Sequence, residues 1–251
     1  MDTTERFAEI VTGPEGSLPL DEAAFLIAAS DHPGLDVAAQ LARLDALAEA
    51  VREPTLTGLR RLLFRDLAFR GDDQDYYDPR NSFLDQVLDR RVGIPITLSV
   101  LLMEVGRRIG VPLAGVSMPG HFLVRDKVDP EVFVDPFARG AELDRRGAEA
   151  RFHVVQGPGS VFDPAFLEPV GRRAIVARML ANLEQGATLR SDRATLAWVL
   201  RLRTLLPEVD AAAARKLAAV LSSSGRYDEA AGVLEDAGDE AAALRLRSKL
   251  N

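Results

Sequence analysis

Apolar residues recur every three to four positions over most of the chain, and this spacing predicts amphipathic helices. A long apolar run at 94–109 predicts one further helix, in which Pro95 suits the first turn and Gly110 the end. Ser82 is a suitable N-cap for the helix that precedes this run. In the first ninety residues the pattern predicts helices at 20–29, 37–51, 55–69 and 83–89.

The spacing of apolar residues changes to alternation after residue 112. Residues 113–118 predict one strand, and residues 120–125 and 132–137 predict a β-hairpin joined by a polar link. A helix followed by three strands is typical of an α+β fold, in which a small antiparallel sheet packs on the long helix. We therefore expect an α+β protein with a cluster of helices at its N-terminus.

One register of this hairpin brings two polar side chains together. If the hairpin is centred near Val128, Leu123 lies opposite Phe133 and His121 lies opposite Asp135. Antiparallel partners share a face of the sheet, so the two side chains would be neighbours. An Asp beside a His fixes the imidazole tautomer and stabilises the imidazolium, as a general base requires. The hairpin therefore predicts His121 as a candidate base and Asp135 as the residue that orients it.

The C-terminal third of the chain is predicted to be entirely helical. Breaks rich in Gly and Pro occupy residues 157–169, so we expect one domain at 1–165 and a second, helical one at 166–251. Residues 225–231 resemble the second half of a tetratricopeptide turn, although a plain helical cap is an equal alternative. The helices are expected at 172–185, 192–206, 210–222, 227–236 and 240–249.

Composition and charge narrow the range of partners. A content of 47% hydrophobic and 27% charged residues is ordinary for a soluble globular protein. A net charge of -7 argues against general nucleic-acid binding, which needs a basic face. The apolar run at 94–105 is too short and too polar to span a bilayer, and residues 1–6 lack the basic start of a signal peptide. We therefore expect neither a nucleic-acid nor a membrane partner.

The chain contains no cysteine. This excludes disulfides, cysteine-ligated zinc and thiolate catalysis, and it fits a reducing cytoplasm. A metal site would have to join His121 and Asp135 to His153, Asp78 or Glu104, and no spacing such as His-x-x-x-His supports it. We therefore expect no metal and no cofactor.

Two hydroxyls on the long helix are the alternative nucleophiles. At about 100° per residue, Ser99 shares the face of Pro95 one turn deeper, whereas Thr97 is rotated away. Either would need a general base within hydrogen-bond reach. Hydroxyls inside helices usually bond back to a main-chain carbonyl, and this is what we expect for both.

A polar and aromatic stretch at 76–82 precedes the long helix. Its Tyr77, Arg80 and Asn81 are candidate binding residues, because a guanidinium and an amide can hold a carboxylate or amide group of a peptide. The alternative is an ordinary turn at Asp78-Pro79.

Four sequence blocks occur in the order 81–84 (NSFL), 90–99 (RRVGIPITLS), 119–124 (PGHFLV) and 134–137 (VDPF). Together they resemble the bacterial Sir-B-type branch of the transglutaminase-like superfamily, over residues 15–185. The resemblance implies a papain-like core with a tetratricopeptide-like tail, and a site of Cys, His and Asp in that order. His121 and Asp135 match the second and third positions, and Pro95 or a neighbour occupies the first.

Two functions are compatible with these patterns. The first is a non-catalytic module that binds a protein or peptide partner or acts as a scaffold, with Tyr77, Arg80, Asn81, Pro95 and Ser99 as candidate cleft residues. Helical repeats, which present concave surfaces, suit this role. The alternative is a hydrolase or transferase in which His121 acts as the base. The oligomeric state is left open by the sequence.

Overall fold

The computed structural model describes residues 2–207 and 211–248, in two compact units. One unit is Glu15–Met179, and the other combines the described parts of Met1–Pro14 and Leu180–Asn251. The boundary that we expected between residues 165 and 166 differs from this division, and so does the place of the N-terminal segment.

Two helices account for the difference. Helix α8 (Arg172–Leu189) is continuous through the point of division, and it includes Gly186, which the sequence suggested as a break. Helix α1 (Thr3–Thr12) contacts α9 (Arg193–Thr204), so the start of the chain groups with its C-terminal part.

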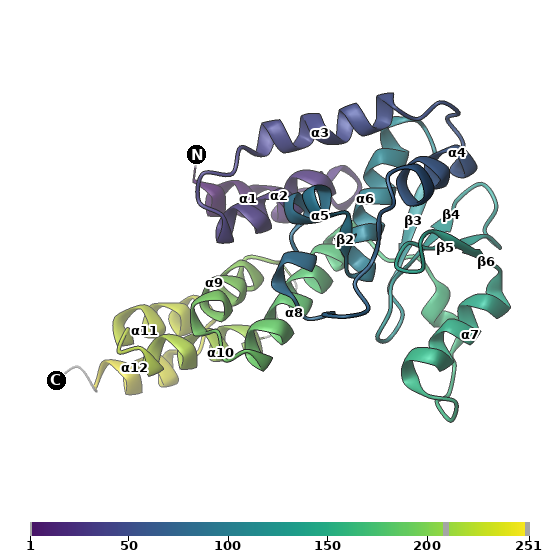
Figure 1. The fold of residues 1–251 in the computed structure, drawn as a ribbon. Coiled ribbons are helices and arrows are strands. Elements are labelled where there is room, and N and C mark those ends of the chain that lie inside the picture. The colour runs from purple at the N-terminus through teal and green to yellow at the C-terminus, as the bar shows by residue number, and fades with distance from the viewer. Residues whose placement is uncertain (1, 208–210, 249–251) are drawn as a thin grey trace. The chain divides into compact units, whose positions relative to one another are not determined.

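The helices of the Glu15–Met179 unit follow the sequence pattern closely. The predicted helix at 55–69 is divided, because α4 passes into a π-helical segment at Arg61–Asp66. The helix expected at 83–89 is shifted by one residue, and Phe83 rather than Ser82 occupies its N-cap. Figure 1 labels α2 (Leu20–Asp31), α3 (Val37–Glu49), α4 (Leu56–Arg60), α5 (Leu84–Arg90), α6 (Pro95–Arg108) and α7 (Arg145–Gln156).

A four-stranded antiparallel sheet follows α6 in the chain, with its strands in sequential order. Three of the strands were predicted, and the fourth, together with α7, was not. A short parallel pair, β1 (Arg70–Gly71) and β2 (Val92–Gly93), was also not predicted. The four strands are β3 (Leu113–Val116), β4 (Leu123–Asp126), β5 (Phe133–Asp135) and β6 (Ala141–Leu143).

Helix α6 lies at the centre of this unit. All of its residues from Pro95 to Gly106 are buried, and it contacts both β3 and β4. Pro95 occupies the first turn, as predicted, and Gly110 follows the helix with a φ of 76°, a left-handed conformation that glycine adopts without strain. The mixed helix-and-sheet class expected from the sequence is therefore confirmed.

The hairpin differs from its predicted register by two residues. Val124 pairs with Val134, and Arg125 pairs with Phe133, whereas a centre at Val128 would have placed Leu123 opposite Phe133. Side chains alternate between the faces of a strand, so a shift of two residues leaves every side chain on its predicted face. The error in register therefore preserves the predicted side of the sheet.

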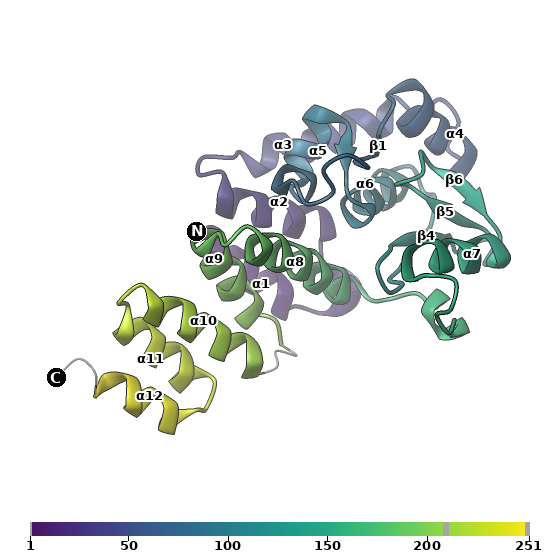
Figure 2. The same cartoon turned by 60° about the horizontal axis from the view of Figure 1, so that its bottom comes forward.

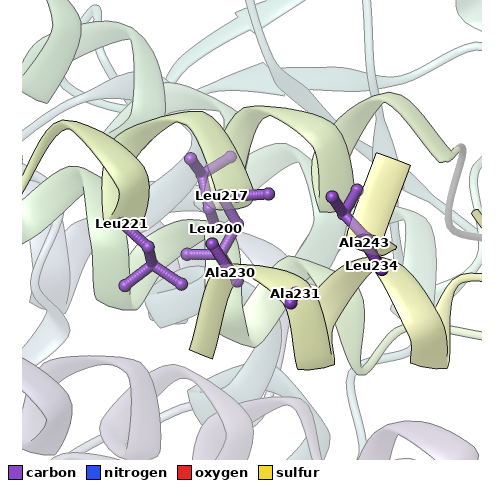
Figure 3. Close-up of a cluster of buried hydrophobic side chains, with 8 residues drawn as sticks. Leu200, Leu217, Leu221, Ala230, Ala231, Leu234 and Ala243 are labelled. Carbon is purple, nitrogen blue, oxygen red and sulfur yellow. The ribbon is translucent and has the colours of Figure 1, made fainter. Parts of the chain in front are cut away.

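The second unit builds its core from small and branched side chains. Helices α9, α10 (Ala211–Ser223), α11 (Tyr227–Asp236) and α12 (Glu240–Arg247) each contact the next in sequence (Figure 2). Alanines let helix backbones approach closely, while leucines supply most of the buried apolar area. Figure 3 shows the cluster of Leu200, Leu217, Leu221, Ala230, Ala231, Leu234 and Ala243.

Candidate functional site

His121 follows a tight turn. The His121 N–H donates to the carbonyl of Met118 at 3.2 Å, and Gly120 has a φ of 73°. Pro119 followed by such a glycine is the arrangement of a type II turn. The left-handed backbone at Gly120 favours glycine, and a Cβ atom there would lie 2.4 Å from the side-chain nitrogen of Gln156, which would have to move.

The predicted neighbour of His121 is in place. His121 Nε2 lies 3.1 Å from Asp135 Oδ1, and both side chains are buried, with exposures of 5% and 0%. The Ala138 N–H donates to the same carboxylate oxygen at 3.1 Å, and the Gly140 N–H donates to the Asp135 carbonyl at 2.9 Å. The proximity of His121 and Asp135 is therefore confirmed, and the turn after β5 fixes the carboxylate. A chemical role for the pair stays a prediction.

The carboxylate has a second partner that sequence reasoning missed. Arg151 Nε, from helix α7, lies 2.9 Å from Asp135 Oδ2. Asp135 therefore lies between an imidazole and a guanidinium, and it links α7 to the end of β5.

A local signal for α7 was present in the sequence. Asp144 accepts a hydrogen bond from the Gly147 N–H at 2.7 Å, which is an N-cap. Ala148 and Phe152, four residues apart, form the buried face of the helix. An acidic cap followed by apolar residues at this spacing predicts a helix, and Arg151 is one residue before Phe152.

The pKa of Asp135 reflects opposing effects. Burial raises this pKa, but the hydrogen bond and charge of His121, the Ala138 N–H and the charge of Arg151 together hold it below its ordinary value. The group is therefore a carboxylate at neutral pH. Because Arg151 already supplies a positive charge, the carboxylate is less available to stabilise an imidazolium at His121 than in a simple orienter–base pair.

The start of α6 carries no available nucleophile. Pro95 has no reactive side-chain group, and the Ser99 hydroxyl donates to the Pro95 carbonyl at 2.7 Å. The Thr97 hydroxyl lies 2.7 Å from the Asn81 carbonyl and 3.1 Å from the Ile94 carbonyl. Both hydroxyls are fully buried. The expectation that they bond to main-chain carbonyls is confirmed.

We expect a fluorophosphonate probe for activated hydroxyls to leave the protein unlabelled. A buried hydroxyl that donates to a carbonyl has no base to remove its proton. Mass spectrometry of the intact protein after incubation measures the adduct. A single adduct that disappears in Ser99→Ala or Thr97→Val would contradict the assignment.

Aromatic rings connect the polar stretch to His121. Tyr77 is 45% exposed, and its ring centroid lies 5.2 Å from that of Tyr76. Tyr76 lies 6.1 Å from Phe137, which in turn lies 6.0 Å from the imidazole of His121, edge to face. The exposed Tyr77 and the buried His121 are therefore the two ends of one aromatic row.

Asn81 and Arg80 are engaged within the loop. The buried Asn81 amide donates to Asp72 Oδ2 at 3.0 Å and to the Asp75 carbonyl at 2.8 Å, and its oxygen accepts from Arg90 Nη1 at 3.0 Å. Arg80 Nη2 lies 2.6 Å from Asp78 Oδ2, and its side chain is 59% exposed. Asn81 thus fixes the loop from inside. Contact of Tyr77 or Arg80 with a ligand stays a prediction.

The side chains weighed as metal ligands are separated in the structure. Glu104 contacts Arg107 at 2.7 Å, and His153 lies 3.9 Å from Glu149. Within residues 2–207 and 211–248, no three His, Cys, Asp or Glu side chains gather closely enough to hold a metal ion.

A second imidazole–carboxylate contact lies elsewhere in the same unit. His32 Nδ1, at the end of α2, lies 3.0 Å from Asp85 Oδ2 in the first turn of α5. The ring of His32 packs edge to face on Phe83, with 5.0 Å between their centroids. This contact joins two helices, and it gives a matched control for substitutions at His121.

The fold and the site define a transglutaminase-like domain. The sequence-family model of the transglutaminase-like superfamily matches residues 33–181, and the chain belongs to this superfamily. Its bacterial relatives include UPF0162 proteins. The one from Xylella fastidiosa strain Temecula1 is 39% identical over 200 residues, which are 74% of this chain and 71% of that protein. The one from Vibrio cholerae is 38% identical over 139 residues, 55% of this chain and 51% of that protein.

A eukaryotic relative is much longer than the region it shares. F-box only protein 21 of Mus musculus is 31% identical over 163 residues, which are 61% of this chain but 25% of that protein. No solved structure matches the chain. None of the helices in the described residues is both long and apolar enough to cross a membrane.

Proposed function

We propose that this protein is a non-catalytic member of the transglutaminase-like superfamily that binds a protein or peptide partner, or acts as a scaffold. The observation that carries the proposal is which side chains occupy the three expected catalytic positions and what they contact. Pro95 stands at the helix start where a cysteine is expected, and the chain contains no cysteine. His121 remains beside Asp135, but Arg151 shares the carboxylate.

Two further observations support this proposal. The hydroxyls of Ser99 and Thr97 are buried and bonded to carbonyls, so they do not replace the missing thiol. The matched region makes up a quarter of F-box only protein 21 of Mus musculus, so a domain of this kind also occurs inside a longer chain. We place the protein in the cytoplasm, because a chain without cysteine fits a reducing compartment.

A specific observation also favours the alternative of a hydrolase or transferase. His121 and Asp135 lie 3.1 Å apart, and the lowered pKa of Asp135 keeps it charged beside the imidazole. In that case His121 would act as a general base on a water molecule, with Asp135 as its positioning residue. Arg151 would then hold the carboxylate in place.

An activity assay separates the two functions. We expect no incorporation of a fluorescent primary amine into casein, and no hydrolysis of a glutamine peptide amide, above the rate in buffer. A rate that is lost in His121→Ala but kept in His32→Ala would establish the alternative. The second variant controls for the loss of an imidazole beside a buried carboxylate, since His32 is 31% exposed and Asp85 is 5% exposed.

A binding assay tests the proposed function itself. We expect affinity-tagged wild type and His121→Ala to retain the same partner from the native cell lysate, because recognition in this proposal needs no proton transfer. Quantitative mass spectrometry compares the retained proteins, and circular dichroism confirms that each variant is folded. A lysate from which neither protein retains any partner beyond those bound by the tag alone would contradict the proposal.

A further inference from the structure

The C-terminal unit contains an open groove of about 620 Å³. Helix α9 supplies Arg193, Trp198 and Arg201 to its lining, and Arg226 and Glu229 come from the start of α11. Figure 2 shows α9, α10 and α11 as neighbouring helices of this unit. Two alanines of α9, Val220 and Leu221 of α10, and Ser224 complete the lining, so charged groups surround a largely apolar wall.

Positive charge predominates in this groove. Three arginines line it against one carboxylate, in a chain whose net charge is -7. Arg226 Nη2 and Arg201 Nη2 lie 2.6 Å and 3.3 Å from Glu229 Oε2, so both arginines already hold one carboxylate. Arg193 is exposed and forms no ion pair within residues 2–207 and 211–248.

The contacts of Glu229 show which ligand group suits the groove. Arg226 donates two hydrogen bonds to it, from Nε and from Nη2, both at 2.6 Å, which is the bidentate geometry of an arginine–carboxylate pair. A planar carboxylate is therefore the group that this arrangement already accommodates. The unpaired Arg193 supplies a further position for such a group.

We propose that the groove binds an acidic peptide segment of a partner protein. Its carboxylates pair with Arg193 and Arg201, and an apolar side chain of the peptide packs on the half-buried indole of Trp198. This inference rests on the proposed function, for which it names the class of partner. Charge complementarity supports it, because a cationic groove on an acidic protein attracts anionic segments selectively.

A peptide fits the groove better than a nucleic acid does. Glu229 would lie against the phosphates, and the chain is acidic overall, whereas nucleic-acid surfaces are broadly basic. Only one aromatic side chain lines the groove, so successive bases would have no row of rings on which to stack.

Trp198 is the only tryptophan of the chain, so its fluorescence reports on the groove directly. The full-length protein is titrated with a short peptide in which Glu and Leu alternate, and with the same peptide carrying Gln in place of Glu. We expect a saturable change in emission with the Glu peptide and none with the Gln peptide. Added salt should weaken the binding, because exposed ion pairs are screened.

Two arginine variants locate the binding. We expect Arg193→Gln to weaken binding of the Glu peptide about tenfold, the usual order for losing one charge-assisted contact. Arg215→Gln removes an exposed arginine of α10 that pairs with Asp239 and does not line the groove. We expect that variant to bind as the wild type does, and circular dichroism verifies that both are folded.

Three outcomes would overturn the inference. These are equal binding of the Gln and Glu peptides, equal weakening by the two arginine variants, or tighter binding of a thymidine oligonucleotide than of the Glu peptide. Failure here is distinguishable from failure of the proposed function. If only the acidic-peptide inference fails, wild type and His121→Ala would still retain their common partner in the lysate binding assay.

Discussion

Replacing Arg108 with Met is expected to lower the free energy of unfolding by about 3 kcal/mol, because the change breaks a buried ion-pair network. Arg108 is 12% exposed, and its Nη2 lies 2.8 Å from Asp21 Oδ2, a carboxylate that is itself 5% exposed. Its Nε also lies 2.6 Å from Asp45 Oδ1, and its Nη1 donates to the Glu104 carbonyl at 3.0 Å. Met keeps much of the side-chain volume and removes the charge.

The carboxylates around Arg108 explain the size of this effect. Burial raises the pKa of Asp21, but the hydrogen bond and charges of Arg108 and Arg107 outweigh it, so the pKa is lowered. Burial and the nearby charge of Asp21 raise the pKa of Glu104. Without Arg108, these two carboxylates repel each other with less compensation, since Arg107 is 47% exposed and lies partly in solvent.

Arg43→Met is the matched control for this prediction. Arg43 pairs with Asp89 at 2.7 Å, but the two side chains are 38% and 58% exposed. Exposed pairs of this kind contribute about 0.2–1 kcal/mol, so the control should lose much less stability than Arg108→Met. Urea denaturation of both variants measures the difference. Equal losses would show that Arg108 acts as a surface residue.

Much of the fold was predictable because its helices carry a regular apolar period. Helix α11, Tyr227–Asp236, has the bounds that the sequence predicts, and α6 differs by one residue at each end. The π-helical segment Arg61–Asp66 was not predictable, because the same apolar spacing continues through it. Residues 208–210, which include the predicted start of α10, and residues 249–251, which include the predicted end of α12, lie outside the described residues.

The site was predicted in part, and the reason is geometric. An even shift in hairpin register keeps side chains on their faces, so His121 and Asp135 still meet. The loop that sets the register carries two local turns, in which Asp126 and Asp129 accept from main-chain N–H groups at 2.9 Å and 3.1 Å. With these turns the hairpin is centred on Asp129, one residue beyond the predicted centre at Val128. Arg151 was missed because it lies on a helix that was not predicted.

Asn81 shows why polarity alone does not identify a binding residue. It lies in a stretch of polar and aromatic residues, which suggested a ligand contact. In the structure its buried amide donates to Asp72 of the same loop and accepts from Arg90 at the end of α5. Burial depends on the path of the whole loop, which a local sequence pattern does not specify.

Asp135→Asn is expected to lower the free energy of unfolding by about 2 kcal/mol at neutral pH, since hydrogen bonds to a charged group contribute more than neutral ones. Asn has nearly the shape of Asp, so the buried site is not emptied. The variant loses the negative charge that faces Arg151 and His121.

The pH dependence of this effect follows from the direction of the pKa shift. The pKa of Asp135 is lower in the folded protein than its ordinary value of about 3.9. Its charge therefore stabilises the fold above that ordinary value, and the contribution is lost as the pH falls through the lowered pKa. Urea denaturation from pH 7 to acid should show the gap between wild type and Asp135→Asn constant at first, then closing below about pH 4.

Arg151→Gln decides what the Asp135 carboxylate does for the protein. If it links α7 to the sheet, Arg151→Gln should increase amide hydrogen exchange across Arg145–Gln156 several-fold while strand β4 stays protected. A double-mutant cycle between Arg151→Gln and Asp135→Asn should then give a coupling energy of at least about 0.5 kcal/mol. If there is no coupling and exchange in α7 is unchanged, the carboxylate interacts functionally with His121 alone. Asp135 would then be the residue that orients His121 as a general base.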